Sequence, residues 1–159
     1  MAGRLDTATI AIRPEALSAI DVARQVIRPW ERSDSVEVRI ESTDDSPTVH
    51  ADPLRLRQIL RNLVSNAVRH GRGPVVVSIN PVGARVELEI SDEGGGIPEE
   101  ALAELFQPYS VIARTDGQPG SVGLGLFVSK RLAELMGGSL SYRREAERTL
   151  FTLSLPSAV

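Results

Sequence analysis

The chain has 159 residues, of which 42% are hydrophobic and 25% are charged, and its 18 basic and 21 acidic side chains give a net charge of −3. This balance is typical of a globular protein of one domain and does not favour binding to nucleic acid. The absence of cysteine excludes disulfides, thiolate metal sites and cysteine nucleophiles. No apolar run approaches the ~20 residues that span a bilayer, so we expect a cytoplasmic chain without direct membrane contact.

The first part of the chain is predicted to contain short strands and one helix. We expect a flexible segment at 1–8, a strand at 9–13, a helix at 14–30 and two more strands at 36–42 and 48–51. The start of this helix is placed at Pro14, because proline has no amide hydrogen to satisfy and suits a first turn. Residues 36–42 alternate apolar and polar side chains, as expected for a half-buried strand.

A long helix is predicted to begin after Asp52 and to end near Gly71. Asp52 can cap the helix with its carboxylate, and Pro53 suits the first turn. The apolar stripe of this helix consists of Leu56, Ile59, Leu60, Leu63, Val64, Ala67 and Val68. Beside it runs a polar stripe, spaced i, i+4, i+7 and i+8, which consists of Asn62, Asn66, Arg69 and His70. Amide oxygens followed by cations can contact a metal ion and phosphates, and a solvated helix face is the alternative.

The second part of the chain alternates paired strands with helices. We expect two strands at 75–80 and 84–90, a short helix at 99–106 and a mobile loop at 107–122. A helix at 123–136 and two closing strands at 139–144 and 149–155 follow. The strands come in neighbouring pairs rather than in strict βαβ alternation, which favours antiparallel pairing. The sequence therefore predicts an α+β fold, a two-layer sandwich with helices on one face of a mixed, mostly antiparallel sheet.

Two glycine clusters interrupt this pattern. The first, SDEGGGIP at residues 91–98, follows a strand, and its three consecutive glycines cost backbone entropy that close approach of another group would explain. Asp92, at the end of that strand, can accept a hydrogen bond from an exocyclic amine. The second, PGSVGLGL at residues 119–126, precedes a helix, where glycine lets phosphate come near unshielded backbone N–H groups. Each cluster alone is also consistent with an ordinary turn, and the second does not fit the P-loop spacing.

Taken together and in order, these motifs resemble the catalytic ATP-binding domain of bacterial sensor histidine kinases, within the wider gyrase, Hsp90, histidine kinase and MutL superfamily. LRQILRNLVSNAVRHG looks like the N box, DEGGGIP the first glycine box, LFQPY the F box and GLGLFVSKRLAELMGG the second glycine box. The resemblance covers residues 9–156, which would form one such domain. It implies the Bergerat ATP-binding fold, with a flexible ATP lid at about 107–122 and no dimerisation or phosphoacceptor domain in the chain.

The resemblance also implies roles for individual residues around Mg-ATP. Asp92 would hydrogen-bond the adenine amino group, and Gly94 and Gly96 would let the base approach the backbone. Asn66 would coordinate Mg²⁺, and Asn62 and Asn66 would be the catalytic residues. Further nucleotide contacts are expected around the phosphates, in the lid and beside the base, from Asn62, Arg69, His70, Ile97, Arg114, Gly123, Leu124, Gly125 and Leu126.

A domain of this family would bind Mg-ATP and donate the γ-phosphate to a histidine on a separate dimerisation and phosphoacceptor domain. A response regulator would act downstream. The chain's own histidines, His50 and His70, do not lie in a helical His-Glu or His-Asp context. The chain alone is therefore expected to bind ATP without phosphorylating itself. The acceptor domain would belong either to the same parent protein or to a separate chain. The resemblance allows the parent protein to be a membrane-anchored sensor.

Asn62 distinguishes among the alternatives. Hydrolytic members of the superfamily, and usually the anti-sigma-factor serine kinases, have a glutamate at this position. Asparagine cannot take a proton near neutral pH and so cannot act as a general base for water. Because the acceptor histidine is missing, the remaining alternative is a degenerate nucleotide-binding or docking module without kinase turnover.

Overall fold

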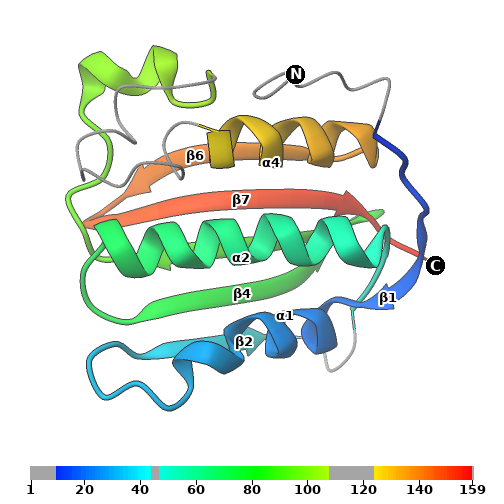
Figure 1. Ribbon diagram of the computed structural model, residues 1–159, viewed down its shortest axis with the longest axis horizontal. Coiled ribbons are helices and arrows are strands. Elements are labelled where there is room, and N and C mark those ends of the chain that lie inside the picture. Colours follow the sequence, from blue (N-terminus) through cyan, green and yellow to red (C-terminus); the bar gives the residue numbers. More distant parts are fainter. Residues whose placement is uncertain (1–9, 44–46, 108–123, 159) are drawn as a thin grey trace.

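The computed structural model describes residues 10–43, 47–107 and 124–158. Within these residues, helices cover one face of a five-stranded sheet (Figure 1). The strands of this sheet, in spatial order, are β2 (Val38–Ser42), β4 (Val75–Val82), β5 (Arg85–Asp92), β7 (Arg148–Pro156) and β6 (Ser139–Glu145). The helices are α1 (Ala19–Ile27), α2 (Pro53–His70) and α4 (Leu124–Leu135), with short 3-10 helices at η2 (Arg28–Trp30) and η3 (Glu99–Glu104). Among the described residues, no helix is both long enough and apolar enough to cross a membrane.

The sheet is mixed and mostly antiparallel. In the described part of the chain, β2 and β4 are parallel neighbours, and the other three neighbouring pairs are antiparallel. Gly83, with a φ of 62°, turns the chain between β4 and β5, and Ala146, with a φ of 56°, turns it between β6 and β7. Tight hairpin turns favour such positive φ angles. The predicted α+β sandwich with one helical layer is therefore confirmed.

The N-terminal elements differ from the sequence prediction. Residues 10–13 form no strand, and the antiparallel pair β1–β3 is instead formed by Glu15–Ser18 and Thr48–Ala51. Helix α1 begins at Ala19, and Ser18 caps it by accepting a hydrogen bond at Oγ from the backbone N–H of Asp21 at 3.2 Å. The predicted helix start at Pro14 is wrong, because pairing with the distant β3 keeps the intervening residues extended.

The other predicted elements that the structure describes are present, with one change of type. The short helix expected over 99–106 is a 3-10 helix at Glu99–Glu104. The strand expected over 36–42 begins at Val38. The predicted flexible segment at 1–8 and all but the first residue of the predicted lid lie outside the described residues.

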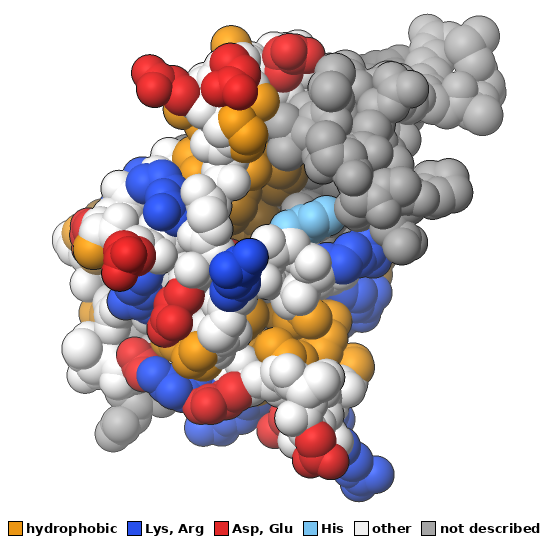
Figure 2. Space-filling view, turned by 90° about the vertical axis from the view of Figure 1, so that its left-hand side faces the viewer, with side chains coloured by type: hydrophobic (Ala, Val, Ile, Leu, Met, Phe, Trp, Pro, Cys, Tyr) orange, Lys and Arg blue, Asp and Glu red, His pale blue; other side chains and the backbone are white. Residues whose placement is uncertain are grey.

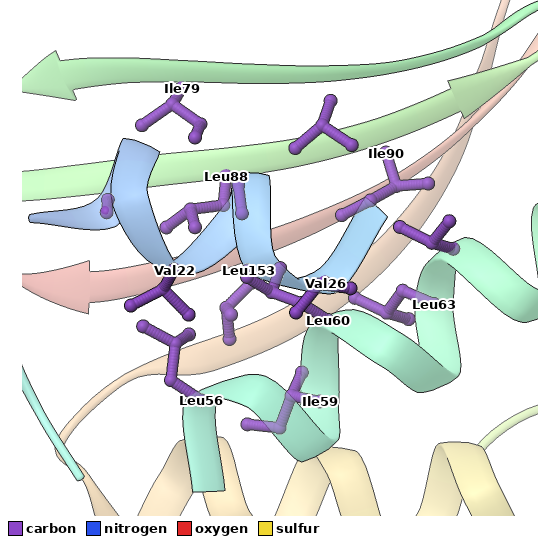
Figure 3. Close-up of a cluster of buried hydrophobic side chains, with 14 of the residues drawn as sticks. Val22, Val26, Leu56, Ile59, Leu60, Leu63, Ile79, Leu88, Ile90 and Leu153 are labelled. Carbon is purple, nitrogen blue, oxygen red and sulfur yellow. The ribbon is translucent and has the colours of Figure 1, made fainter. Parts of the chain in front are cut away.

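The hydrophobic core fills the space between the helices and the sheet. Helix α2 contributes its predicted apolar stripe, all of which is buried except Val68, which packs at the border of the core. Figure 3 shows the side chains of α1, α2 and the strands meeting there, including those of Val22, Val26, Leu56, Ile59, Leu60, Leu63, Ile79, Leu88, Ile90 and Leu153. Because the apolar stripe holds α2 against the sheet, the polar stripe beside it has a fixed orientation.

Asp52 fixes the start of α2. One carboxylate oxygen accepts hydrogen bonds from the backbone N–H groups of Leu54 at 2.9 Å and Arg55 at 3.2 Å, and the other accepts from that of Arg13 at 2.8 Å. Burial raises the pKa of the Asp52 carboxyl, but these three hydrogen bonds and the charge of Arg55 together outweigh burial and leave the pKa below its usual value. The ionised carboxylate therefore stabilises the folded chain at neutral pH.

We expect Asp52→Ala to lower the free energy of unfolding at pH 7 by about 1–2 kcal/mol, because the helix loses its cap. The folded pKa lies below the unfolded one, so this stabilisation is complete above the unfolded pKa and is lost as pH falls through the folded pKa. Urea denaturation at neutral pH and at a series of acid pH values measures both effects. Asp21→Ala, which removes an exposed carboxylate from the first turn of α1, is the control and should change stability by less than about 0.5 kcal/mol. A difference between wild type and Asp52→Ala that does not shrink in acid would contradict this explanation.

Candidate functional site

The elements that carry the predicted site residues meet at one end of the molecule. Helix α2 ends there and α4 begins there (Figure 1). Strand β5 ends beside the end of α2, because Asp92 packs against Gly71. Figure 2 looks onto this end and shows hydrophobic side chains within a hollow, with a histidine side chain beside it. The fold therefore brings the polar stripe, the first glycine cluster and the start of α4 to one face.

Asp92, the last residue of β5, is a buried carboxylate with 6% of its surface exposed. The backbone N–H of Gly94 donates to its Oδ1 at 2.7 Å. Burial raises the pKa of this carboxyl above its usual value, although the backbone N–H groups of Gly94 and Arg72 and the charges of Arg144 and His70 act in the opposite direction. Buried carboxylates with a perturbed pKa are candidates for ligand binding.

Glycines allow the backbone to pack directly against Asp92 and Arg144, at positions where a Cβ would collide. A Cβ at Gly71 would overlap the carboxyl group of Asp92. A Cβ at Gly94 would come within 2.9 Å of both Asp92 Oδ1 and Gly71 Cα. Gly96 has a φ of +78°, a conformation that favours glycine, and a Cβ there would come within 2.6 Å of Arg144 Cδ. Gly94 thus packs against the buried carboxylate, and Gly96 packs against Arg144. A role of these glycines in binding a base stays a prediction.

Asn62 contacts α4. Its Nδ2 donates to Oγ of Ser129 at 3.1 Å, and a Cβ at Gly125 would overlap its amide group. Ser129 is 2% exposed, so this hydrogen bond lies between two packed helices. The structure therefore brings Asn62 and Gly125 together, and the Asn62 side chain holds the start of α4 against the middle of α2. A contact of Asn62 with phosphate stays a prediction.

The other residues of the polar stripe follow toward the end of α2. Asn66 is half-buried, and Arg69 and His70 are exposed in the last turn. They lie four, seven and eight residues after Asn62 and therefore share its side of the helix. Positive charge on His70 lowers the pKa of the Asp92 carboxyl, against the larger effect of burial. The stripe thus leads from the start of α4 toward the buried carboxylate.

Some of the predicted nucleotide contacts lie outside the described residues. These are Arg114, Gly123 and the side chain of Leu124. Leu126, in the first turn of α4, and Ile97, after the glycine cluster, are partly buried and pack against the core. The structure therefore places Leu126 and Ile97 near the site, where their observed contacts are packing contacts.

Sequence reasoning missed Gly71, Tyr142 and Arg144. The sequence indicates Gly71 only as the end of a helix, and its packing against Asp92 depends on where α2 meets β5. Nη1 of Arg144 donates to the carbonyl oxygen of Gly94 at 2.5 Å, and the hydroxyl of Tyr142 accepts from the backbone N–H of Ile97. Residues 142 and 144 share one face of a strand, but no local pattern shows which loop that face contacts.

The side chains of this site fit a magnesium nucleotide better than a metal ion held by protein alone. Across the described residues, no group of three or more His, Cys, Asp or Glu side chains could hold a metal ion. The amide of Asn66 offers a neutral oxygen ligand, which suits Mg²⁺ that phosphates and water also coordinate. The buried carboxylate of Asp92 suits the amino group of a base, because it accepts hydrogen bonds.

The fold defines a class of protein. A mixed sheet with one layer of helices is the α/β sandwich of histidine kinase catalytic domains, such as that of ThkA, which superimposes with a TM-score of 0.77 at 22% identity over 91% of this chain and 95% of that one. Residues 51–159 match the family described as histidine kinase-, DNA gyrase B-, and HSP90-like ATPases. The chain belongs to this family, which implies that it binds ATP, and the resemblance seen in the sequence is confirmed.

The similar curated proteins include several sensor kinases. Sensor protein TorS of Escherichia coli strain K12 is 40% identical over 119 residues, which cover 73% of this chain and 13% of TorS. Virulence sensor protein BvgS of Bordetella bronchiseptica is 38% identical over 152 residues, which cover 89% of this chain and 12% of BvgS. The full-length structure of ShkA in complex with AMPPNP superimposes with a TM-score of 0.79 at 29% identity over 94% of this chain and 32% of ShkA. This chain therefore spans a small part of these longer proteins.

Proposed function

We propose that the chain binds Mg-ATP and donates the γ-phosphate to a histidine of a separate dimerisation and phosphoacceptor domain. The observation that carries this proposal is the buried Asp92 carboxylate, packed against Gly71 and Gly94 at the end of α2. In this proposal, residues 9–156 form one catalytic domain, and the chain acts in the cytoplasm. Its parent protein would act with a response regulator in a two-component system.

Asp92 would recognise the base. When ionised, its carboxylate can only accept hydrogen bonds, so it would take one from the exocyclic amino group of adenine. The N–H of Gly94 already donates to Oδ1 and fixes the orientation of the carboxylate. Gly94 and Gly96 would keep the loop backbone packed against Asp92 and β6, so that the ring could lie beside this backbone.

The polar stripe of α2 would serve the phosphates. Asn66 would hold the metal ion through its amide oxygen, and Arg69 and His70 would place positive charge nearby. Bound Mg²⁺ would neutralise part of the phosphate charge during transfer. Asn62, tied to Ser129, would orient the start of α4 beside them. Phosphoryl transfer depends mainly on positioning and charge. The buried apolar face of α2 would provide the positioning, and Arg69 and His70 in its last turn would provide the charge.

The described histidines of this chain do not suit the acceptor role. His50 lies in the short strand β3, and His70 is the last residue of α2. The nucleophile would therefore come from another domain. The name of a relative from Emericella nidulans, two-component system protein A, supports the proposed pathway; it is 34% identical over 151 residues, which cover 87% of this chain and 22% of that protein.

Calorimetric titration with ATP, in Mg²⁺ and in EDTA, tests the proposal. We expect saturable binding that Mg²⁺ strengthens, and we expect Asn66→Ala to remove the roughly tenfold gain from Mg²⁺ while leaving binding in EDTA unchanged. Gln58→Ala, which removes an exposed amide from the same helix, is the matched control and should behave as wild type. Transfer of labelled phosphate to a separately supplied acceptor domain is then measured.

Two outcomes would contradict the proposal. Folded wild type that binds no ATP would exclude the kinase function and leave a docking module. Wild-type affinity that is the same in Mg²⁺ and EDTA would contradict the metal-binding role of Asn66.

A further inference from the structure

The glycine loop, residues 93–97, is held by two side chains of β6. Nη1 of Arg144 donates to the carbonyl oxygen of Gly94 at 2.5 Å. The hydroxyl of Tyr142 accepts from the backbone N–H of Ile97 at 2.8 Å. Side chains two residues apart on a strand point to the same face, so a single strand contacts both ends of this loop.

The register of the sheet places Arg144 in this position. Thr149 of β7 is paired with Asp92 of β5 on one side and with Arg144 of β6 on the other. Directly opposed residues of neighbouring strands share a face, so these three residues form one row across the sheet. Nη1 of Arg144 also donates to Oγ1 of the buried Thr149 at 2.9 Å. The guanidinium group is therefore fixed by the same row that ends in Asp92.

The glycine loop has few side chains with which to fix itself. A Cβ added at Gly95 would find nothing within 4 Å, and Gly96 has a φ of +78°. A Cβ added at Gly96 would come within 2.6 Å of Arg144 Cδ and 2.7 Å of the Tyr142 hydroxyl, so both side chains pack directly on this glycine. Ordering three consecutive glycines costs much backbone entropy, and contacts from β6 offset that cost.

Arg144 also acts on Asp92 through its charge. Burial raises the pKa of the Asp92 carboxyl, and the positive charge of Arg144 opposes that shift together with the charge of His70. The neighbouring Arg143 lies on the opposite face of β6 and pairs with Glu89 at 3.1 Å and Glu145 at 3.4 Å. Two adjacent arginines of one strand therefore have different tasks.

We propose that Arg144 is a positioning residue for nucleotide recognition, which together with Tyr142 holds the glycine loop against Asp92 in the conformation that receives the base. The proposal rests on the proposed function, because it assigns the loop to base binding. Arg144 touches the loop backbone and acts on the base through it.

The test compares Arg144→Met, Arg144→Lys and the matched control Arg143→Met in the full chain. Amide hydrogen exchange of the glycine loop is measured without ligand, and the ATP dissociation constant is measured by calorimetry. We expect Arg144→Met to speed exchange in the loop and to raise the dissociation constant, each by roughly tenfold. Arg144→Lys should give intermediate values, because lysine keeps the charge but not the planar geometry of the guanidinium group. Arg143→Met should match wild type in both measurements.

Wild-type exchange in the loop of Arg144→Met would overturn the proposal, as would full recovery of affinity in Arg144→Lys without recovery of exchange. Hydrogen exchange tests whether Arg144 holds the glycine loop, even if wild type binds no ATP. In that case the proposed function fails separately, in the titration of wild type. Thermal unfolding of the three variants shows whether any effect is local to the loop.

Discussion

Asp92→Asn is expected to raise the dissociation constant for ATP by roughly 100-fold, while the chain stays folded. The ionised carboxylate would accept a hydrogen bond from the adenine amino group, and hydrogen bonds to charged groups contribute more than neutral ones. The Asn side chain has the same shape, but it offers an amide N–H where a carboxylate oxygen stood, and two donors would then face each other. Burial of the ionised Asp92 is unfavourable, as its raised pKa shows, so the neutral amide removes that cost.

The same carboxyl predicts how binding and stability change with pH. Its folded pKa is raised by burial above the ordinary value, so it gains a proton at a higher pH than other aspartates do. As pH falls through the folded pKa, ATP affinity of wild type should fall, because the protonated carboxyl loses acceptor capacity. Over the same range the contribution of Asp92 to the free energy of unfolding should rise, since the folded state binds the proton more tightly. Asp92→Asn should lack both trends.

Glu93→Gln provides the matched control for these measurements. Glu93 is the next residue, its carboxylate is exposed, and its backbone N–H bonds to the carbonyl oxygen of Arg72 whatever its side chain is. We expect this variant to bind ATP within about twofold of wild type. If Asp92→Asn binds ATP as tightly as Glu93→Gln does, Asp92 does not recognise the base.

Elements with local signals could be predicted from the sequence. The Asp52–Pro53 start and the apolar stripe of α2 are local patterns, and the structure has this helix at Pro53–His70. The hairpins β4–β5 and β6–β7 likewise follow from neighbouring strand-like segments that short turns connect. The first strand could not be predicted, because β1 pairs with the distant strand β3. In this pair Glu15 lies opposite Ala51.

The candidate site shows the same division. Asp92 and the glycines after it form a recognisable segment, and the structure packs them together. The hydrogen bond of Asn62 with Ser129 spans 67 residues, and that of Arg144 with Gly94 spans 50. Such contacts depend on helix packing and sheet register, which periodicity in one segment does not encode. Residue type therefore singles out Asp92 as a candidate acceptor but does not reveal the residues that pack around it.

Gly94→Ala and Gly95→Ala are expected to differ strongly, although they change adjacent residues of the glycine loop. A Cβ at Gly94 would lie 2.9 Å from both Asp92 Oδ1 and the backbone Cα of Gly71, with Arg72 N at 3.3 Å, so the loop or the carboxylate must shift. A Cβ at Gly95 meets nothing within 4 Å. We expect Gly94→Ala to weaken ATP binding at least tenfold and to lower the free energy of unfolding by about 1–3 kcal/mol, through overpacking. Gly95→Ala should bind ATP as wild type does.

Gly95→Ala should also leave stability unchanged or raise it by about 0.5 kcal/mol, because alanine lowers the conformational entropy of the unfolded chain where the folded φ is not positive. Calorimetry and urea denaturation of both variants measure the contrast. Equal losses in the two variants would mean that the loop needs glycine for flexibility along its whole length. Loss in Gly94→Ala alone would mean that binding needs close packing of the loop backbone against Asp92 and Gly71, the two groups that a methyl at residue 94 would push apart.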